Sequence, residues 1–145
     1  MRIDVRSVRR LTASELTTTG VLGTWTIGEP SVAIRGDEIL LTGNEYAARS
    51  LDRGVGWQAL DPKTYLNPPP PTEFCCDQTV YHDAAHDLTF WLLQYRPSAT
   101  DNTLRLAVKR GTLADDDWFL WDFSATTIDP TWRDEELDYN HASAT

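Results

Sequence analysis

Three acidic residues stand in comparable places in this sequence, each beside the start of a short stretch with strand-like patterning: Glu29, Asp77 and Asp138. Carboxylates accept hydrogen bonds from hydroxyl groups and attract cations, so a group of them at one edge of a fold can bind a sugar or a cation. The simpler hypothesis is that each acid caps the turn leading into its strand. The choice between the two depends on whether the fold brings these stretches together.

Further polar residues follow the second strand-like stretch in each half of the chain. Asn44 occupies this place in the first half, and Gln94, Tyr95 and Arg96 occupy it in the second. Because the turns of an antiparallel meander alternate between two edges of a sheet, we expect these residues at the same edge as the acids. The sequence thus predicts a polar mouth whose candidate ligand-binding residues are Glu29, Asn44, Asp77, Gln78, Gln94, Tyr95, Arg96 and Asp138.

Other patterns that carry chemistry are absent from the sequence. There is no glycine-rich phosphate loop and no Gly-x-Ser-x-Gly motif. His82, His86 and His141 are scattered, and the first two flank a turn, where a surface position is expected. The acidic run 115–117 lacks the alternating ligand spacing of a calcium loop and is interpreted as a solvated turn. We therefore expect no metal and no cofactor.

The two cysteines are adjacent, Cys75 and Cys76. This spacing does not fit a zinc site, which needs more ligands at wider intervals. Neighbouring cysteines can form a vicinal disulfide of unusual geometry. The simpler expectation is two buried thiols, or one thiol inside and one outside, at the start of a strand.

The elements that must position these residues are short strands. Apolar runs separated by turn residues roughly every eight to twelve positions are typical of an all-β fold. The first group of predicted strands covers 31–35, 38–42, 45–50 and 57–60. The second group covers 78–82, 88–94, 103–110 and 118–123. Residues 78–82 match 31–35, and Trp57 and Trp118 fall in equivalent places. Each group has the short connections of a four-stranded antiparallel meander.

The two groups form an internal repeat with a period of roughly fifty to sixty residues, which is in the range of β-propeller blades. Residues 137–143 resemble a third first strand. Four consecutive prolines, 68–71, predict an extended spacer between the groups. The predicted organisation is an N-terminal extension (1–24), blade one (25–60), a Pro-rich linker (61–74), blade two (75–123), and a linker with the start of a third blade (124–145).

One motif carries a resemblance to a known family. The segment 50–57 resembles the Asp-box, or bacterial neuraminidase repeat, Ser/Thr-x-Asp-x-Gly-x-Thr-Trp/Phe. It matches at Ser50, Asp52, Gly54 and Trp57, and Gly56 replaces the usual Thr. The Asp carboxylate is expected to accept hydrogen bonds from the turn backbone, Gly to supply an unusual φ, and Trp to cover the hairpin. The second half keeps only the Trp of this motif.

The resemblance, which extends over residues 25–143, implies a sialidase-like β-propeller with blades of four strands. Two blades and the first strand of a third imply an incomplete propeller, because closure usually takes four to eight blades. In this family the Asp-box is structural and lies on the outer rim. The family also implies an extracellular location, although Met1–Arg10 has four arginines and no apolar stretch of a signal peptide after them.

Catalysis by this chain alone is not predicted. A family sialidase needs three arginines that grip the substrate carboxylate, a Tyr–Glu pair and an acid/base Asp, and no arginine here has the expected context. We expect a glycan-recognition or glycosidase-related module. The alternatives are a non-catalytic protein-binding scaffold, and part of a glycoside hydrolase that is active only in a complete propeller, with self-association as one way to complete it.

The composition excludes other classes of partner. A formal net charge of −9 argues against nucleic-acid binding, which requires clustered positive charge. No apolar run approaches the roughly 20 residues of a membrane span. Six Trp and five Tyr suit a fold in which aromatic rings fill the space between sheets.

Overall fold

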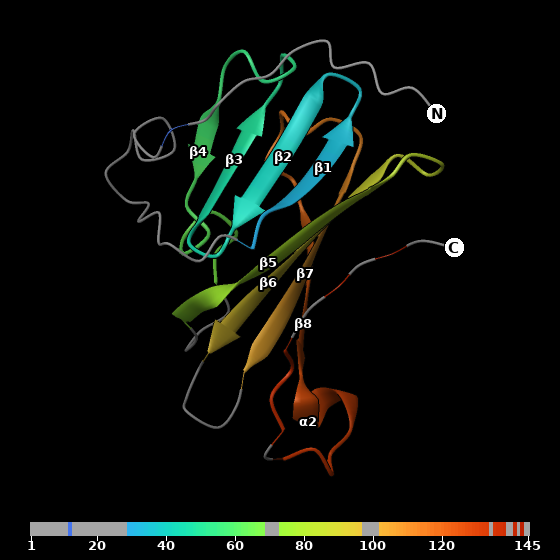
Figure 1. Cartoon of the computed structure of the whole chain (residues 1–145). Helices are drawn as coiled ribbons and strands as arrows, with labels where there is room; N and C mark the ends of the chain where they lie inside the picture. The colour runs from blue at the N-terminus through green and yellow to red at the C-terminus, as the bar shows by residue number, and fades with distance from the viewer. Residues whose placement is uncertain are drawn as a thin grey trace, which may run out of the picture.

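The computed structural model of the chain describes Thr12 and residues 29–68, 73–96, 102–133, 135–138, 141 and 143. These residues form two four-stranded antiparallel sheets, followed by a single helical turn (Figure 1). The all-β class predicted from the sequence is confirmed. Within the described ranges, no helix has the length and apolar character needed to cross a membrane.

The first sheet is a meander in which each strand pairs with the next along the chain. Every strand lies within one residue of its predicted range, because the apolar patterns end at turns rich in Gly, Asp and Asn. We call this sheet 1; its strands are β1 (Ser31–Arg35), β2 (Glu38–Gly43), β3 (Tyr46–Ser50) and β4 (Gln58–Leu60).

Sheet 2 repeats the same order of strands. Its strands are β5 (Glu73–Asp83), β6 (Leu88–Arg96), β7 (Thr103–Arg110) and β8 (Phe119–Ser124). The main departure from the predicted ranges is β5, which begins five residues earlier than expected. The helical turn α2 (Ala125–Ile128) follows β8 directly, and the Ser124 side chain caps it by accepting a hydrogen bond from Thr127 N.

The early part of β5 contains an irregularity that decides the candidate site. Phe74 pairs with Tyr95 and Gln78 pairs with Leu93, so three residues of β5 (75–77) stand opposite the single residue Gln94 of β6. A bulge of this kind interrupts the ladder, bends the strand and redirects its side chains. The side chains of Cys75, Cys76 and Asp77 therefore need not alternate between the two faces of the sheet.

The strand pairing in the β1–β2 and β5–β6 hairpins shows which residues of the two sheets are equivalent, and this equivalence differs by one residue from the predicted one. Arg35 pairs with Glu38 at the end of the first hairpin, and Asp83 pairs with Leu88 at the end of the second. Residues 31–35 thus correspond to 79–83, and the prediction that they match 78–82 is wrong by one position. This shift exchanges the two faces of the sheet, because side chains alternate along a strand.

The core lies between the two sheets. Ser31 Oγ accepts a hydrogen bond from Val80 N (3.0 Å) and donates one to Val80 O (3.2 Å), which joins β1 to β5. The fully buried ring of Trp91 has Tyr65 and Trp118 beside it, each with a centroid separation of 5.8 Å. The buried apolar side chains from the two sheets include Ala33, Leu40, Ala47, Leu60, Val80, Trp91, Leu93 and Ala107.

Charged side chains also join the two sheets. The Arg35 guanidinium contacts the Asp87 carboxylate at 2.6 and 2.8 Å. Arg49 Nη1 donates to Leu113 O (2.7 Å) and to Asp116 Oδ1 (2.8 Å) in the β7–β8 connection. Because both arginines belong to sheet 1 and their partners to sheet 2, these contacts fix the relative position of the sheets.

The predicted linker 61–74 is more than a spacer. Pro62 and Leu66 are buried, and Arg105 Nη1 donates to the carbonyl oxygens of Leu66 (2.6 Å) and Asn67 (2.5 Å). Residues 73 and 74 already belong to β5. Most of the proline run, like residues 1–11 and 13–28, lies outside the described residues, so the predicted extended spacer and N-terminal extension are not described.

The described part of residues 137–143 does not form the predicted third first strand. The Asn102 side chain receives a hydrogen bond from Leu137 N (2.9 Å) and donates one to Leu137 O (2.5 Å). Gln94 Nε2 donates to the same carbonyl at 3.0 Å. The backbone N–H and C=O groups of Leu137 thus bond to the side chains of Gln94 and Asn102 and not to the backbone of a neighbouring strand.

Candidate functional site

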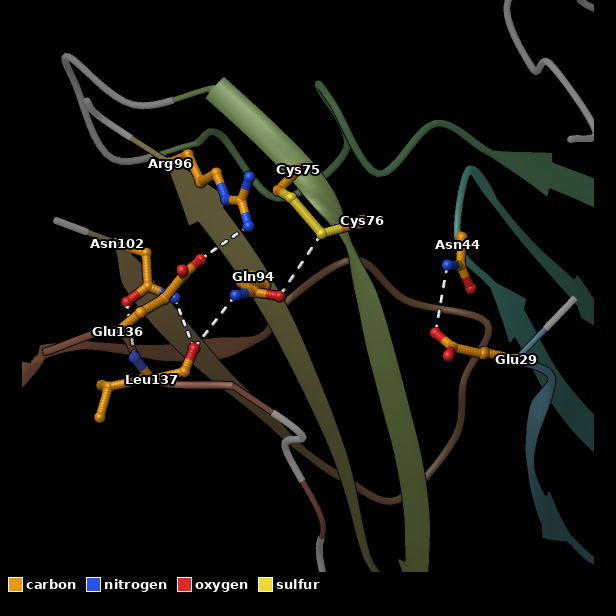
Figure 2. Close-up of a disulfide and its surroundings, with 9 residues drawn as sticks. All are labelled: Glu29, Asn44, Cys75, Cys76, Gln94, Arg96, Asn102, Glu136 and Leu137. Carbon is orange, nitrogen blue, oxygen red and sulfur yellow. Dashed lines mark hydrogen bonds and ion pairs between the residues drawn. A yellow bond between two sulfur atoms is a disulfide. The ribbon is translucent and has the colours of Figure 1, made fainter. Parts of the chain in front are cut away.

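The bulge in β5 holds a disulfide between Cys75 and Cys76 (Figure 2). The expectation of two thiols is therefore wrong. In a regular strand adjacent side chains point to opposite faces, whereas the bulge takes both residues out of the ladder and lets their sulfur atoms meet. The pair thus forms a compact apolar patch on the strand, with both residues partly accessible to solvent.

Gln94 connects this disulfide to the C-terminal segment. Its Oε1 lies 3.5 Å from Cys76 Sγ (Figure 2), and because a disulfide sulfur carries no proton this is a polar contact and not a hydrogen bond. Its Nε2 holds Leu137 O. Gln94 is almost completely buried, so its amide serves mainly to position the bulge and the segment 135–138.

Asp77, the third residue of the bulge, shares its surroundings with two other acids. Burial raises the pKa of the Asp77 carboxyl above its ordinary value, and the carboxyls of Glu29 and Asp138 raise it further by charge repulsion and hydrogen bonding. The three acids that the sequence singled out are therefore brought together, although they lie 48 and 61 residues apart in consecutive pairs (77 − 29 and 138 − 77).

Two of these acids, Glu29 and Asp77, border a hollow of about 320 Å³ between the starts of the two sheets. Its walls come from the segment before β1, from β5 beyond the bulge, and from the C-terminal segment. The lining residues are Glu29, Pro30, Ser31, Asp77, Gln78, Thr79 and His141. A space of this size is at the lower end of the range of small-molecule sites.

Asn44 extends the polar wall from the β2–β3 turn. Its Nδ2 donates to Glu29 Oε2 at 3.1 Å, as Figure 2 shows, so the turn and the chain before β1 meet at this edge. Its Oδ1 is shielded from solvent and has no hydrogen-bond partner among the described atoms. Because the protein covers this oxygen, Asn44 contributes to the site by holding Glu29 and not as an open acceptor for a ligand.

Two of the predicted mouth residues serve the core. Gln78 Nε2 donates to Gly43 O (2.6 Å) and Tyr46 O (3.1 Å), and its Oε1 accepts from Trp91 Nε1 (3.0 Å). Tyr95 is fully buried with its hydroxyl on Pro62 O (3.3 Å), and burial raises the pKa of this phenol to about 12. Gln78 borders the hollow with its amide already in use, and Tyr95 lies away from it.

Arg96 lies at the rim and is engaged by another side chain. Its Nη2 contacts Glu136 Oε1 at 2.7 Å (Figure 2), and both side chains are about half exposed. An exposed pair of this kind contributes little to stability. Arg35, Arg49, Arg53 and Arg105 are likewise paired with carboxylates in other places, so the structure does not assemble these five arginines into one carboxylate-binding group.

The turn between β3 and β4 has the internal hydrogen bonds that its sequence predicts. Asp52 Oδ1 accepts from Gly56 N and from Ser50 Oγ, at 2.8 and 2.9 Å. Gly54 has φ of +82°, and the Trp57 indole donates to Gly54 O at 3.0 Å. The turn lies at the sheet edge opposite Asn44, since the β1–β2 and β3–β4 turns share one edge and the β2–β3 turn the other.

The site as a whole has a polar wall and an apolar patch, but no set of metal ligands. Among the described residues there is no group of three His, Cys, Asp or Glu side chains with the geometry to hold a metal ion. Sequence analysis gave the disulfide as the less favoured alternative, and it missed the bulge and the place of His141 in the wall of the hollow. The adjacent cysteines were the one available signal for the bulge, because they can only join if the strand alternation is broken.

The fold and this site define an all-β protein of two packed four-stranded meanders with a disulfide-bearing bulge at one edge. Comparisons with models of protein families, with curated proteins and with solved structures gave no match to this chain.

Proposed function

We propose that this chain is a sialidase-like β-propeller segment that recognises a glycan in the hollow around Asp77. The observation that carries the proposal is the meeting of Glu29, Asp77 and Asp138, of which Glu29 and Asp77 line one hollow of about 320 Å³. The acids come from three separate parts of the chain, and their mutual repulsion opposes folding. Clusters that disfavour their own charge are often functional sites.

The chemistry of the hollow suits a polyol. A carboxylate accepts hydrogen bonds and a protonated carboxyl also donates one, and sugar hydroxyls can do both. The disulfide in the same bulge supplies apolar surface, and sugar rings present apolar faces of their own.

The sign of the charge restricts the ligand. The carboxylates around Asp77 repel one another and would also repel the carboxylate of an anionic sugar, so a sialic acid or uronic acid is disfavoured. The expected ligand is a neutral or amino-bearing glycan. A sialidase, in contrast, would need cationic side chains that bind the carboxylate of its substrate. The expected ligand therefore distinguishes glycan recognition by this chain from sialidase catalysis.

Two features of the fold support the propeller part of the proposal. Each sheet is a four-stranded meander with short connections, and the two sheets pack through their apolar faces. The Ser50–Trp57 turn has the hydrogen bonds that an Asp-box turn would need. It lies at the edge away from the hollow, where a structural motif would not interfere with a ligand.

Glycan binding is tested with Asp77→Asn, which keeps the shape of the side chain and removes its charge. We expect the protein to bind neutral oligosaccharides on an array and in calorimetry, and the variant to lose about ten-fold in affinity or more, as expected for the loss of one charged hydrogen-bonding partner. Glu73→Gln is the matched control, because Glu73 is an exposed acid on the same strand outside the hollow. Absence of glycan binding, or equal loss in both variants, would refute the proposal.

A protein-binding scaffold is the second candidate function. It is favoured by the exposed aromatic residues Phe119, Trp121 and Phe123 on β8, because solvent-facing aromatic clusters are typical of interaction surfaces. A third candidate, glycoside hydrolysis in a completed ring, requires catalytic groups from further blades. Hydrolysis of a neutral glycan by the isolated chain would favour this candidate over simple recognition.

A further inference from the structure

The two sheets have the same order of strands, and equivalent faces of the two sheets point the same way. The face that sheet 1 buries against sheet 2 is therefore equivalent to the face that sheet 2 exposes. The strand registers establish this equivalence. Ala33 pairs with Leu40 and faces the core, and the corresponding pair in sheet 2, Tyr81 with Phe90, lies on the face away from sheet 1. Likewise Leu60 corresponds to Trp121.

The exposures of this last pair show the consequence. Leu60 is 3% exposed because sheet 2 covers it, whereas Trp121 is 49% exposed. Cross-strand partners share a face, so the registers define the whole outer face of sheet 2. Its central part is apolar apart from one threonine and consists of Thr79, Tyr81, Phe90, Leu92, Leu106, Val108, Phe119 and Trp121. The same face continues with Asp83, Leu88 and Arg110 at one end and with Gln94, Leu104 and Phe123 at the other.

The face of sheet 1 that points away from sheet 2 is also apolar, and its exposed residues lie on β1. Val32 and Ile34 are 53% and 58% exposed, and they pair with Leu41 and Ile39 on the same face. By register, Val32 corresponds to Val80, a residue of sheet 2 that packs against sheet 1 inside the chain. The outer face of sheet 1 is therefore the equivalent of a surface that already forms the interface between the sheets.

We propose that a second copy of this chain docks head to tail, with the outer face of its sheet 1 on the outer face of sheet 2. The interface within the chain is the geometric template, since it joins the same two kinds of face through β1, β2 and β5. The central, apolar part of both outer faces carries no charge, and the two charged residues of the sheet 2 face, Asp83 and Arg110, lie at its end beside Leu88, where they can stay at the solvated rim of the contact.

A head-to-tail contact uses two different patches, so each copy keeps one patch open after pairing. Repetition of the same contact generates a closed ring or a larger assembly. This proposal is independent of glycan binding, because Asp77 lies in the bulge at the edge of the sheets. Among the residues that line the hollow, Thr79 alone belongs also to the outer face of sheet 2.

Two single variants remove one patch each: Ile34→Glu for sheet 1 and Trp121→Glu for sheet 2. Both side chains are largely exposed in one copy, so a charge there leaves the fold intact, which circular dichroism checks. We expect sedimentation velocity to show concentration-dependent assembly of the unaltered 16.4 kDa chain, and each variant alone to associate at least about ten-fold more weakly. Val55→Glu is the matched control, because Val55 is an exposed apolar residue outside both faces.

Mixing the two variants provides the decisive measurement. Ile34→Glu keeps an intact sheet 2 face and Trp121→Glu an intact sheet 1 face, so the mixture is expected to form a dimer and nothing larger. The proposal is overturned if the unaltered chain stays monomeric at about 100 μM, if either variant alone associates like the unaltered chain, or if the mixture stays monomeric. Asp77→Asn is expected to assemble normally, which separates this proposal from glycan recognition.

Discussion

The Arg49 side chain of sheet 1 forms hydrogen bonds with the β7–β8 connection of sheet 2, and its replacement by methionine tests how much these bonds stabilise the fold. The side chain is 8% exposed. It donates to Gln58 Oε1 (2.9 Å), Tyr65 Oη (3.3 Å), Leu113 O (2.7 Å) and Asp116 Oδ1 (2.8 Å). Methionine fills a similar volume and donates no hydrogen bond, so the change isolates the polar contacts.

The bond to Leu113 O dominates the expected cost, because both groups are buried. A hydrogen bond from a charged group to a buried carbonyl contributes about 1.5–3 kcal/mol. Asp116 is well exposed, so its ion pair with Arg49 adds less than about 1 kcal/mol. We therefore expect Arg49→Met to lower the free energy of unfolding by about 2–4 kcal/mol.

Thermal and urea unfolding measure this loss. For a chain of this size it corresponds to a fall of roughly 10 °C in Tm, or of roughly 1–2 M in the urea midpoint at an unchanged slope. Arg53→Met is the matched control. Arg53 also pairs with a carboxylate, Asp37 at 2.6 Å, but its side chain is 77% exposed, so no resolvable change is expected. Equal shifts in the two variants would refute the argument that burial of Arg49 decides its contribution.

Two further predictions concern the bulge. The pKa of Asp77 is higher in the folded chain than its ordinary value of 3.8, so its contribution to stability is present at low pH and is lost as the pH rises through the folded pKa. Asp77→Asn should accordingly unfold at higher temperature than the unaltered protein at pH 7, with the difference disappearing below about pH 4; a destabilised variant at pH 7 would contradict the proposed repulsion. For the disulfide, the native protein should resist alkylation until a reductant is added, and should then take up label at both Cys75 and Cys76; labelling without reductant, read by mass spectrometry, would show free thiols.

The sequence alone determined the local structure well. Seven of the eight predicted strands begin within one residue of their observed start, because β-strand patterning and the turn residues that end it are properties of neighbouring residues. The hydrogen bonds of the Ser50–Trp57 turn were predictable for the same reason. The meeting of Glu29 and Asp77 agrees with their matching places before the first strands of the two meanders, whereas Asp138 comes near Asp77 through a segment that does not form the predicted strand.

Only the tertiary structure decided which residues work at the site and which belong to the core. Tyr95 follows the predicted strand 88–94 as a mouth residue would, but in the structure it belongs to β6, and its buried hydroxyl donates to Pro62 O of the linker. The bulge at 75–77 depends on a two-residue mismatch between β5 and β6, and a mismatch between partners cannot be read from either strand alone. The one-residue shift between the repeats arises in the same way, from pairing across a hairpin, and it determines which face of each sheet is buried and which is left open.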